Sequence, residues 1–139
     1  MDVSKIDARD LVALAAKIAT QAYAPYSGFR VGAAVRGEHG IYLGTNVENA
    51  SYGLALCAER AALAAAVAAG ERRVSAVGIA CIDAPADAGC EQRLPCGACR
   101  QWLAELAPGA VLATLGVARD YTVAELLPFA FALKDQTPP

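Results

Sequence analysis

Apolar residues recur along the chain with two different periods, which predict a mixture of helices and strands. Within residues 4–21 they return every three or four positions, as in an amphipathic helix, and Ser4 and Asp7 are placed as its capping pair. Residues 29–36 and 41–47 are rich in β-formers and flank a Gly-Glu-His-Gly turn, which predicts a hairpin. The first third of the chain therefore indicates a helix followed by a two-stranded hairpin.

The remaining two thirds of the chain continue this alternation. The predicted elements are helices over 57–69 and 96–106, buried strands over 74–82 and 110–115, and a short edge strand and helical turn within 120–127. The run 74–82 is almost unbroken in its apolar character, the pattern of a strand that is covered on both faces. We therefore expect an α/β fold, a three-layer α/β/α sandwich around a mixed sheet of about five strands.

Length and composition restrict the class of protein. A chain of 139 residues with 56% hydrophobic residues supports one packed core, so we expect a single domain over residues 1–139. The formal net charge of -2 lacks the basic excess that binds a phosphate backbone, which argues against a nucleic-acid partner. The longest apolar run, residues 61–69, is too short to span a membrane, and residues 1–10 are polar rather than signal-like, so we expect a cytoplasmic location.

The segment 61–69 also bears on assembly, because it is apolar on all sides of the predicted helix. Such a helix needs burial on more than one side, and the sheet of a small chain covers only one. The other side could face a second subunit, or the alanines could reflect a composition bias. Both interpretations stay open on the sequence.

Three of the five cysteines lie where two of the predicted helices begin. Cys57 opens the first of these helices, and Cys96 and Cys99 share one face of the first turn of the second. The positive end of a helix dipole favours the thiolate, which is the form that binds a metal ion. Three thiolates suit Zn²⁺ and leave a fourth position open for water, which is typical of a catalytic zinc site. We therefore predict one zinc ion per chain at this cluster.

The other two cysteines and the Cys-x-x-Cys spacing leave alternatives open. Cys81 lies within an apolar strand and is interpreted as a core residue, whereas Cys90 could act as a fourth ligand. The segment Cys96-Gly97-Ala98-Cys99 at a helix start is also typical of a redox dithiol. A zinc module without catalytic activity is a third possibility.

Glu59 favours the catalytic interpretation. The segments Cys57-Ala58-Glu59 and Pro95-Cys96-Gly97-Ala98-Cys99 match a pattern in which a ligand, a spacer and a glutamate precede a proline-led cysteine pair. A glutamate two residues past a ligand can exchange protons at a metal site as a general acid and base. A first-turn glutamate can also simply stabilise the helix dipole, but a redox dithiol has no use for it.

From Ala22 to about Phe131 the sequence resembles the family of small, zinc-dependent cytidine deaminases that act on free nucleosides. The motifs that carry the resemblance, in the family's order, are Ala24–Ala34 (APYSGFRVGAA), Asn46–Tyr52 (NVENASY), Cys57–Arg60 (CAER) and Pro95–Gln101 (PCGACRQ). The resemblance implies a hydrolase of pyrimidine salvage that removes the C4 amino group from cytidine, and from deoxycytidine, giving uridine or deoxyuridine and ammonia. A related deaminase of nucleoside analogues, of the blasticidin type, is the alternative.

The same resemblance implies roles for individual residues. Cys57, Cys96 and Cys99 hold the zinc. Glu59 transfers protons, and Arg60 bonds to the ligand sulfurs and offsets their charge. The substrate-binding residues that it implies are Phe29, which stacks on the base, Asn46 and Glu48, which bind the sugar, Ala58, and Phe131. The carboxylate of Glu48 would repel a phosphate on the sugar, which favours a free nucleoside.

Assembly is the last property that the resemblance implies. The family is generally a homotetramer in which an aromatic residue near the C-terminus caps the pocket of a neighbouring subunit. Phe131 matches that position, with Phe129 as the competing candidate, and Tyr52 is expected to line a subunit contact. The connection over residues 116–122 is shorter than in many relatives, so the register of Phe131 depends on how the last strand is placed.

Overall fold

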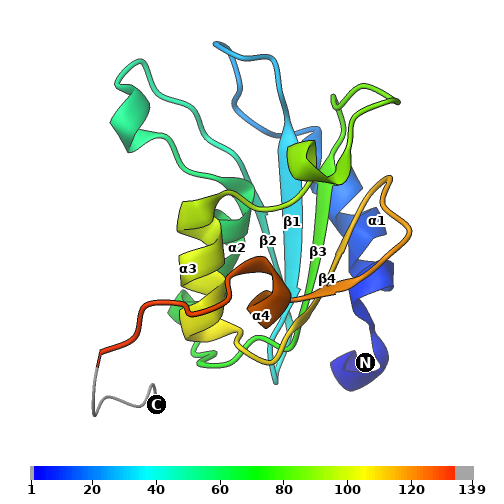
Figure 1. The fold of residues 1–139 in the computed structure, drawn as a ribbon, viewed down its shortest axis with the longest axis vertical. Coiled ribbons are helices and arrows are strands. Elements are labelled where there is room, and N and C mark those ends of the chain that lie inside the picture. Colours follow the sequence, from blue (N-terminus) through cyan, green and yellow to red (C-terminus); the bar gives the residue numbers. More distant parts are fainter. Residues whose placement is uncertain (1, 134–139) are drawn as a thin grey trace.

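The computed structural model describes residues 2–133, in which a mixed five-stranded sheet lies between helices (Figure 1). The helices and strands are α1 (Ala8–Ala19), β1 (Val31–Arg36), β2 (Ile41–Thr45), α2 (Ala58–Ala68), β3 (Ala76–Cys81), α3 (Gly97–Leu106), β4 (Val111–Thr114), β5 (Tyr121–Thr122) and α4 (Val123–Leu126). Short 3₁₀ turns lie at Val3–Lys5 (η1), Tyr52–Leu54 (η2) and Cys90–Gln92 (η3). The strand order is β2-β1-β3-β4-β5, and only β3 and β4 pair in parallel.

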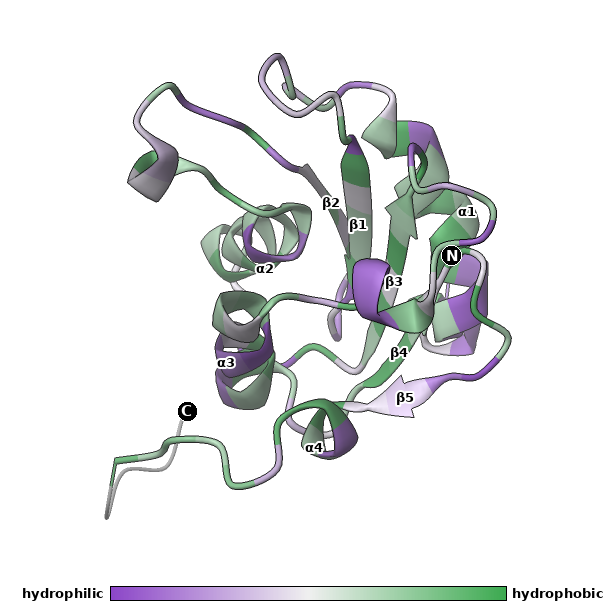
Figure 2. Ribbon diagram, turned by 45° about the horizontal axis from the view of Figure 1, so that its top comes forward, coloured by the Kyte–Doolittle hydropathy of each residue, from purple (hydrophilic) through white to green (hydrophobic). Residues whose placement is uncertain are grey.

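Alternation along the strands supplies both faces of the sheet with apolar side chains. On β1, Ala33 and Val35 join the core beneath α2 and α3, whereas Ala34 joins the core beneath α1. Every residue of β3 is buried, as its unbroken apolar pattern predicts. Figure 2 shows hydrophobic residues along β3 and β4, and hydrophilic ones on the edge strand β5 and at the η3 turn. The expected three-layer α/β/α sandwich with a mixed sheet is confirmed.

Two helices approach the sheet closely because the strands carry glycine beneath them. A Cβ atom at Gly44 would lie 2.4 Å from the backbone nitrogen of Ala62 in α2. One at Gly78 would lie 2.5 Å from the carbonyl carbon of Leu11 in α1. No side chain fits into such a gap, so the glycine on β2 allows α2 to lie directly on the sheet. This close packing places Cys57, which caps the N-terminus of α2, at the edge of the sheet.

Helix α1 begins later than the sequence pattern predicts. Its N-cap is Asp7, which accepts from the backbone N–H of Asp10 at 2.8 Å. The Asp10 carboxylate in turn accepts from the backbone N–H of Asp7 at 3.1 Å, which completes a capping box. Ser4 belongs to η1, where its N–H and hydroxyl donate to Asp2. The expected Ser4–Asp7 capping pair is therefore wrong, because each residue finds a partner in its own turn.

Helix α2 is alanine-rich and packs one side against the sheet. Ala62, Leu63 and Ala66 are buried there, while Ala64 and Ala65 are exposed in the single chain. The second side of α2 is therefore uncovered at these alanines in the single chain. Within residues 2–133, no helix is long and apolar enough to cross a membrane.

Candidate active site

One edge of the sheet collects the segments that carry the predicted site residues. The start of β1 lies beside the ends of β2 and β3, because Val31 pairs with Cys81 and Gly32 pairs with Thr45. The connecting segments before β1, after β2 and after β3 therefore all emerge at this edge (Figure 1). Residues that lie far apart in the sequence meet there.

The three cysteines predicted as metal ligands come together at this edge. Cys57 is the N-cap of α2, Cys96 is the N-cap of α3, and Cys99 lies in the first turn of α3. Their sulfur atoms all lie within 4.8 Å of one another, and those of Cys57 and Cys96 are 3.8 Å apart. Among the described residues the cluster includes neither Cys81, which is buried in β3, nor Cys90, which is exposed in η3.

The geometry and chemistry of the cluster suit a zinc ion. Tetrahedral coordination with Zn–S bonds of about 2.3 Å requires sulfur atoms roughly 3.8 Å apart, which is the spacing of Cys57 and Cys96. A hydrogen bond from the Cys99 thiol lowers the pKa of Cys57 to about 5 despite burial, and Arg60 assists. The cluster thus stabilises a thiolate, which is the form of cysteine that binds zinc.

Arg60 brings a positive charge to the cluster from the first turn of α2. Its Nη2 donates to the sulfur of Cys57 at 3.4 Å. This hydrogen bond to Cys57 is also the main reason why the pKa of Arg60 is raised. Its Nε is buried and has no hydrogen-bond partner among the described residues. Buried N–H groups normally have a hydrogen-bond acceptor. The guanidinium is therefore better suited to a cluster of thiolates, which accept hydrogen bonds, than to a cluster of neutral thiols.

Arg60→Ala is expected to weaken zinc binding about 10- to 100-fold, because the variant loses the donor and the cation beside the ligand sulfurs. Competition against a chelator of known zinc affinity measures this change. Arg72→Ala is the matched control, since Arg72 donates to the backbone carbonyls of Val67, in the last turn of α2, and Glu71, just after the helix, and not to the cysteine cluster. Equal zinc affinity in the Arg60 variant and the wild type would contradict a role of Arg60 at the cluster.

Glu59 lies beside the cluster in a buried position. It is the second residue of α2 and is only 6% exposed. Burial raises its pKa to about 7, and the negative charge of Cys57 adds to the effect. A carboxyl group enclosed next to a metal site is the residue type that can take up and release a proton during hydrolysis.

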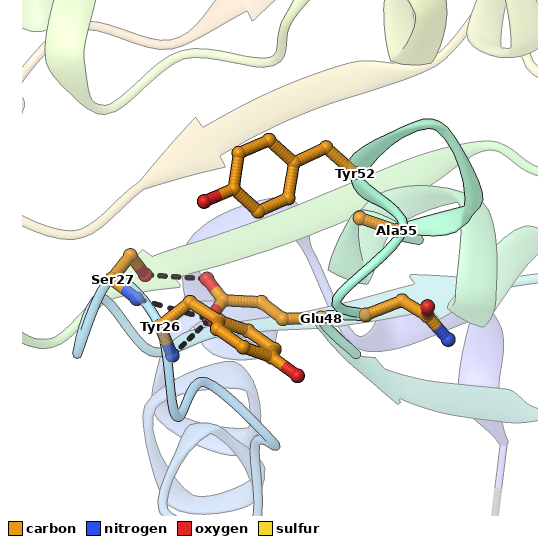
Figure 3. A pocket seen from close by; sticks show the side chains of 6 residues that line it. Tyr26, Ser27, Glu48, Tyr52 and Ala55 are labelled. Carbon is orange, nitrogen blue, oxygen red and sulfur yellow. Dashed lines mark hydrogen bonds between the residues drawn. The ribbon is translucent and has the colours of Figure 1, made fainter.

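Glu48 lies in a pocket on the same edge of the sheet (Figure 3). The pocket has a volume of about 320 Å³ and is lined by Tyr26, Ser27, Glu48, Asn49, Tyr52 and Ala55. The Glu48 carboxylate accepts from the backbone N–H groups of Tyr26 and Ser27 at 3.0 and 3.1 Å, and from the Ser27 hydroxyl. The bond from the Ser27 hydroxyl is the main reason why the pKa of Glu48 is lowered. The carboxylate is thus held ionised and oriented.

Asn46 holds the start of β1 with both ends of its amide. Its Oδ1 accepts from the backbone N–H of Val31, and its Nδ2 donates to the carbonyl of Phe29, both at 2.8 Å. The Phe29 side chain is partly buried and packs against the core cluster that also contains Ala58. Asn46 therefore fixes the backbone on either side of Arg30, a function that the sequence does not indicate.

The aromatic residues predicted to act between subunits lie on the surface of the single chain. Tyr52 is 80% exposed, and its ring meets that of Tyr26 edge to face with centroids 6.5 Å apart. Phe129 and Phe131 are also exposed, and the Phe131 carbonyl accepts from Gln101 Nε2 at 3.0 Å. Phe129 adopts a positive φ of 57°, an uncommon conformation for a residue with a side chain. The roles of all three stay predictions.

Several residues at this edge had no role assigned from the sequence. Tyr26 and Ser27 belong to one of the matching motifs, but only the structure shows them binding the Glu48 carboxylate. Asp83, which forms an ion pair with Arg30, belongs to no motif quoted above. The motif Ala24–Ala34 therefore points to Tyr26 and Ser27 as site residues, whereas no motif points to Asp83.

Known proteins are similar to this chain in both sequence and fold. The family model described as the cytidine and deoxycytidylate deaminase zinc-binding region matches residues 5–115. The cytidine deaminase of Sporosarcina psychrophila is 42% identical over 136 residues, which cover 94% of this chain and 95% of the relative. That of Halalkalibacterium halodurans is 43% identical over 136 residues, which cover 94% and 98%.

A solved structure from the same family has a similar fold. The crystal structure of cytidine deaminase from Burkholderia pseudomallei superposes with a TM-score of 0.74 at 41% identity, and the match covers 88% of this chain and 98% of that one. The resemblance noted in the motifs is thus confirmed along most of the chain, and it favours the deaminase interpretation over a redox dithiol. This chain belongs to the family of cytidine and deoxycytidylate deaminases that share a zinc-binding region.

Proposed function

We propose that this protein hydrolyses cytidine and deoxycytidine to uridine and deoxyuridine with release of ammonia, as an enzyme of pyrimidine salvage. The observation that carries the proposal is the meeting of three cysteine sulfurs within 4.8 Å at the starts of two helices, next to the buried Glu59. Three protein ligands leave room for a reactant, whereas a structural zinc site normally has four. The relatives named above carry this activity in their names.

In this proposal one zinc ion per chain is held by Cys57, Cys96 and Cys99. When bound, zinc supplies a Lewis acid that allows water to react as a nucleophile at neutral pH. Glu59 takes a proton from the attacking water and delivers it to N3 of the cytosine ring. The second proton of the same water, carried by the new hydroxyl group on C4, moves to the exocyclic nitrogen as the bond from C4 to that nitrogen breaks, so that ammonia leaves and a carbonyl remains. Burial of Glu59 excludes bulk water from these transfers.

The substrate is positioned by residues at the start of β1 and after β2. Phe29 stacks on the base, and Ala58, which directly follows Cys57 at the start of α2, contacts the substrate beside the cluster. Asn46 retains a second amide N–H for the sugar after it has bonded to the Phe29 carbonyl. Glu48, held by Tyr26 and Ser27, accepts from a sugar hydroxyl.

Comparison of cytidine with cytidine 5′-monophosphate tests the substrate class. We expect kcat/KM for cytidine to exceed that for the nucleotide by about 100-fold, because the Glu48 carboxylate repels a nearby phosphate. Loss of the absorbance of cytosine and the appearance of uridine measure both rates. A higher rate on the nucleotide would contradict a free-nucleoside enzyme, and preference for blasticidin S would favour the analogue-type deaminase.

We further propose a cytoplasmic homotetramer. Support comes from the exposed aromatic rings of Tyr52 and Phe131 and from the uncovered alanines of α2, which are unusual for a chain that functions alone. In this arrangement Tyr52 lines a subunit contact, and Phe131 enters the pocket of a neighbouring subunit. Sedimentation of the zinc-loaded protein should give the mass of four chains, and the mass of one chain would contradict the proposal.

A further inference from the structure

Arg30 and Asp83 form a forked ion pair between segments 53 residues apart in the sequence. Arg30 Nε donates to Asp83 Oδ2 at 2.8 Å, and Nη2 donates to Oδ1 at 2.9 Å. The backbone N–H of Arg30 also donates to Oδ2 at 2.9 Å. These bonds hold the pKa of Asp83 at about 2. Because both oxygens are engaged, the pair fixes orientation as well as distance.

The pair holds one side of the segment that carries Phe29. On the other side, Asn46 binds the carbonyl of Phe29 and the N–H of Val31. Arg30, between these two residues, is bound to Asp83 through its backbone and its side chain. The backbone beneath the Phe29 ring is therefore fixed from β2 on one side and from the end of β3 on the other.

Asp83 also begins the loop 83–95, which leads directly into Cys96. This loop is held by the buried Arg93, whose guanidinium donates to the carbonyls of Pro85 and Leu115 at 2.8 and 3.2 Å. The carbonyl of Arg93 accepts from the hydroxyl of Thr114 on β4 at 3.1 Å. The two ends of the loop, Asp83 and Cys96, are thus parts of one fixed segment. Any shift of Asp83 relative to the cysteines is restricted.

We propose that Asp83, acting through Arg30, is a positioning residue that fixes the place of the Phe29 ring relative to the cysteine cluster. The inference rests on the proposed function, in which Phe29 stacks on the base. Asp83 does not touch the substrate in this proposal. Its effect is to keep the Phe29 segment ordered before the substrate arrives, which lowers the ordering cost of binding.

Hydrogen exchange tests this positioning without reference to activity. In Asp83→Ala, peptides covering residues 29–31 should exchange about tenfold faster than in the wild type, because a charge-assisted bond that closes the segment is lost. Asp120→Ala is the matched control, since Asp120 pairs with Arg9 at 2.5 Å and the arginine partners of the two aspartates are similarly exposed. Unchanged exchange at 29–31, or the same increase in the control, would overturn the proposal.

Kinetics with cytidine separate positioning from general loosening of the fold. Asp83→Ala should raise KM about tenfold with a smaller change in kcat, and it should retain one zinc per chain. In a Phe29→Ala background the same substitution should add less than about twofold, because its effect passes through the ring. Additive effects in the double variant, or loss of zinc, would contradict the proposal. Arg30→Gln supplies the same comparison if Asp83→Ala fails to fold.

The two proposals fail in different ways. If the wild type does not deaminate cytidine, the proposed function is wrong, but the exchange experiment still decides whether Asp83 orders residues 29–31. If cytidine is deaminated and exchange at 29–31 does not respond to Asp83→Ala, only the positioning role is wrong.

Discussion

Glu59→Gln is expected to lower kcat for cytidine about 10²- to 10⁴-fold while zinc binding persists. Glutamine has the same shape as glutamate and fits the buried position, but it cannot take up and release a proton at this step. Steady-state deamination rates, with zinc content measured on the same samples, determine whether the chemistry or the metal site is lost. A loss of activity with full zinc content is the expected result.

Glu105→Gln provides the matched control for this variant. Glu105 lies on α3 with an exposed side chain, so the same change in charge should leave the rate unaltered. If Glu59→Gln keeps wild-type turnover, Glu59 is only a first-turn residue that stabilises the helix dipole. If both variants lose activity together, the effect is one of charge and not of proton transfer.

Cys99→Ser is expected to reduce zinc affinity by at least about 100-fold, and turnover should fall with it. Cys99 is completely buried and is one of the three cysteines that we propose as zinc ligands, so the variant should lose a large share of the metal-binding free energy. Zinc content after gel filtration, together with chelator competition, measures the loss. Activity restored by excess zinc would show that the fold survives the substitution.

Cys90→Ser is the control that addresses the fourth-ligand alternative. Cys90 is exposed and lies outside the cluster, so its replacement should change neither zinc affinity nor rate. A loss of zinc equal to that in Cys99→Ser would make Cys90 a ligand. In that case the site would have four protein ligands and no open position.

The sequence predicts the elements of this fold well because their patterns are local. The apolar run 74–82 contains β3, and the glycine-containing turn separates β1 from β2. The two cysteine-bearing helices begin where the cysteines and Pro95 indicate. The predicted start of α1 is wrong because the N-cap of the helix is Asp7, which forms a capping box with Asp10 and not with Ser4. Which of several nearby polar residues caps a helix depends on the local backbone geometry, and the hydrophobic pattern of the sequence does not specify that geometry.

Contacts that bring together distant segments are the part that the sequence does not predict. Glu71 is 2% exposed, and its carboxylate accepts from the backbone N–H groups of Glu38 and His39 and from the Tyr42 hydroxyl. Burial alone would raise the pKa of Glu71, but these hydrogen bonds outweigh it and lower the pKa. The sequence around Glu71 does not show that its carboxylate closes the hairpin turn, because the donors lie 29 to 33 residues earlier in the chain.

In the candidate site, too, some features are predictable from the sequence and others are not. Cys57, Cys96 and Cys99 are predictable because helix starts and spacing already restrict them. The hydrogen bonds from the Phe29 segment to Asn46 and Asp83 depend on strand register, which places the start of β1 beside the ends of β2 and β3. Register emerges only when the whole sheet has formed, so the sequence gives no direct indication of it.

Titration of chelator-stripped protein with zinc, with cytidine as the substrate, tests the central claim most directly. The rate of cytidine loss should rise in proportion to added zinc and level off at one zinc per chain, with uridine and ammonia formed in equal amounts. Full turnover in the stripped protein, or one bound zinc per chain without any turnover, would contradict a zinc-dependent deaminase.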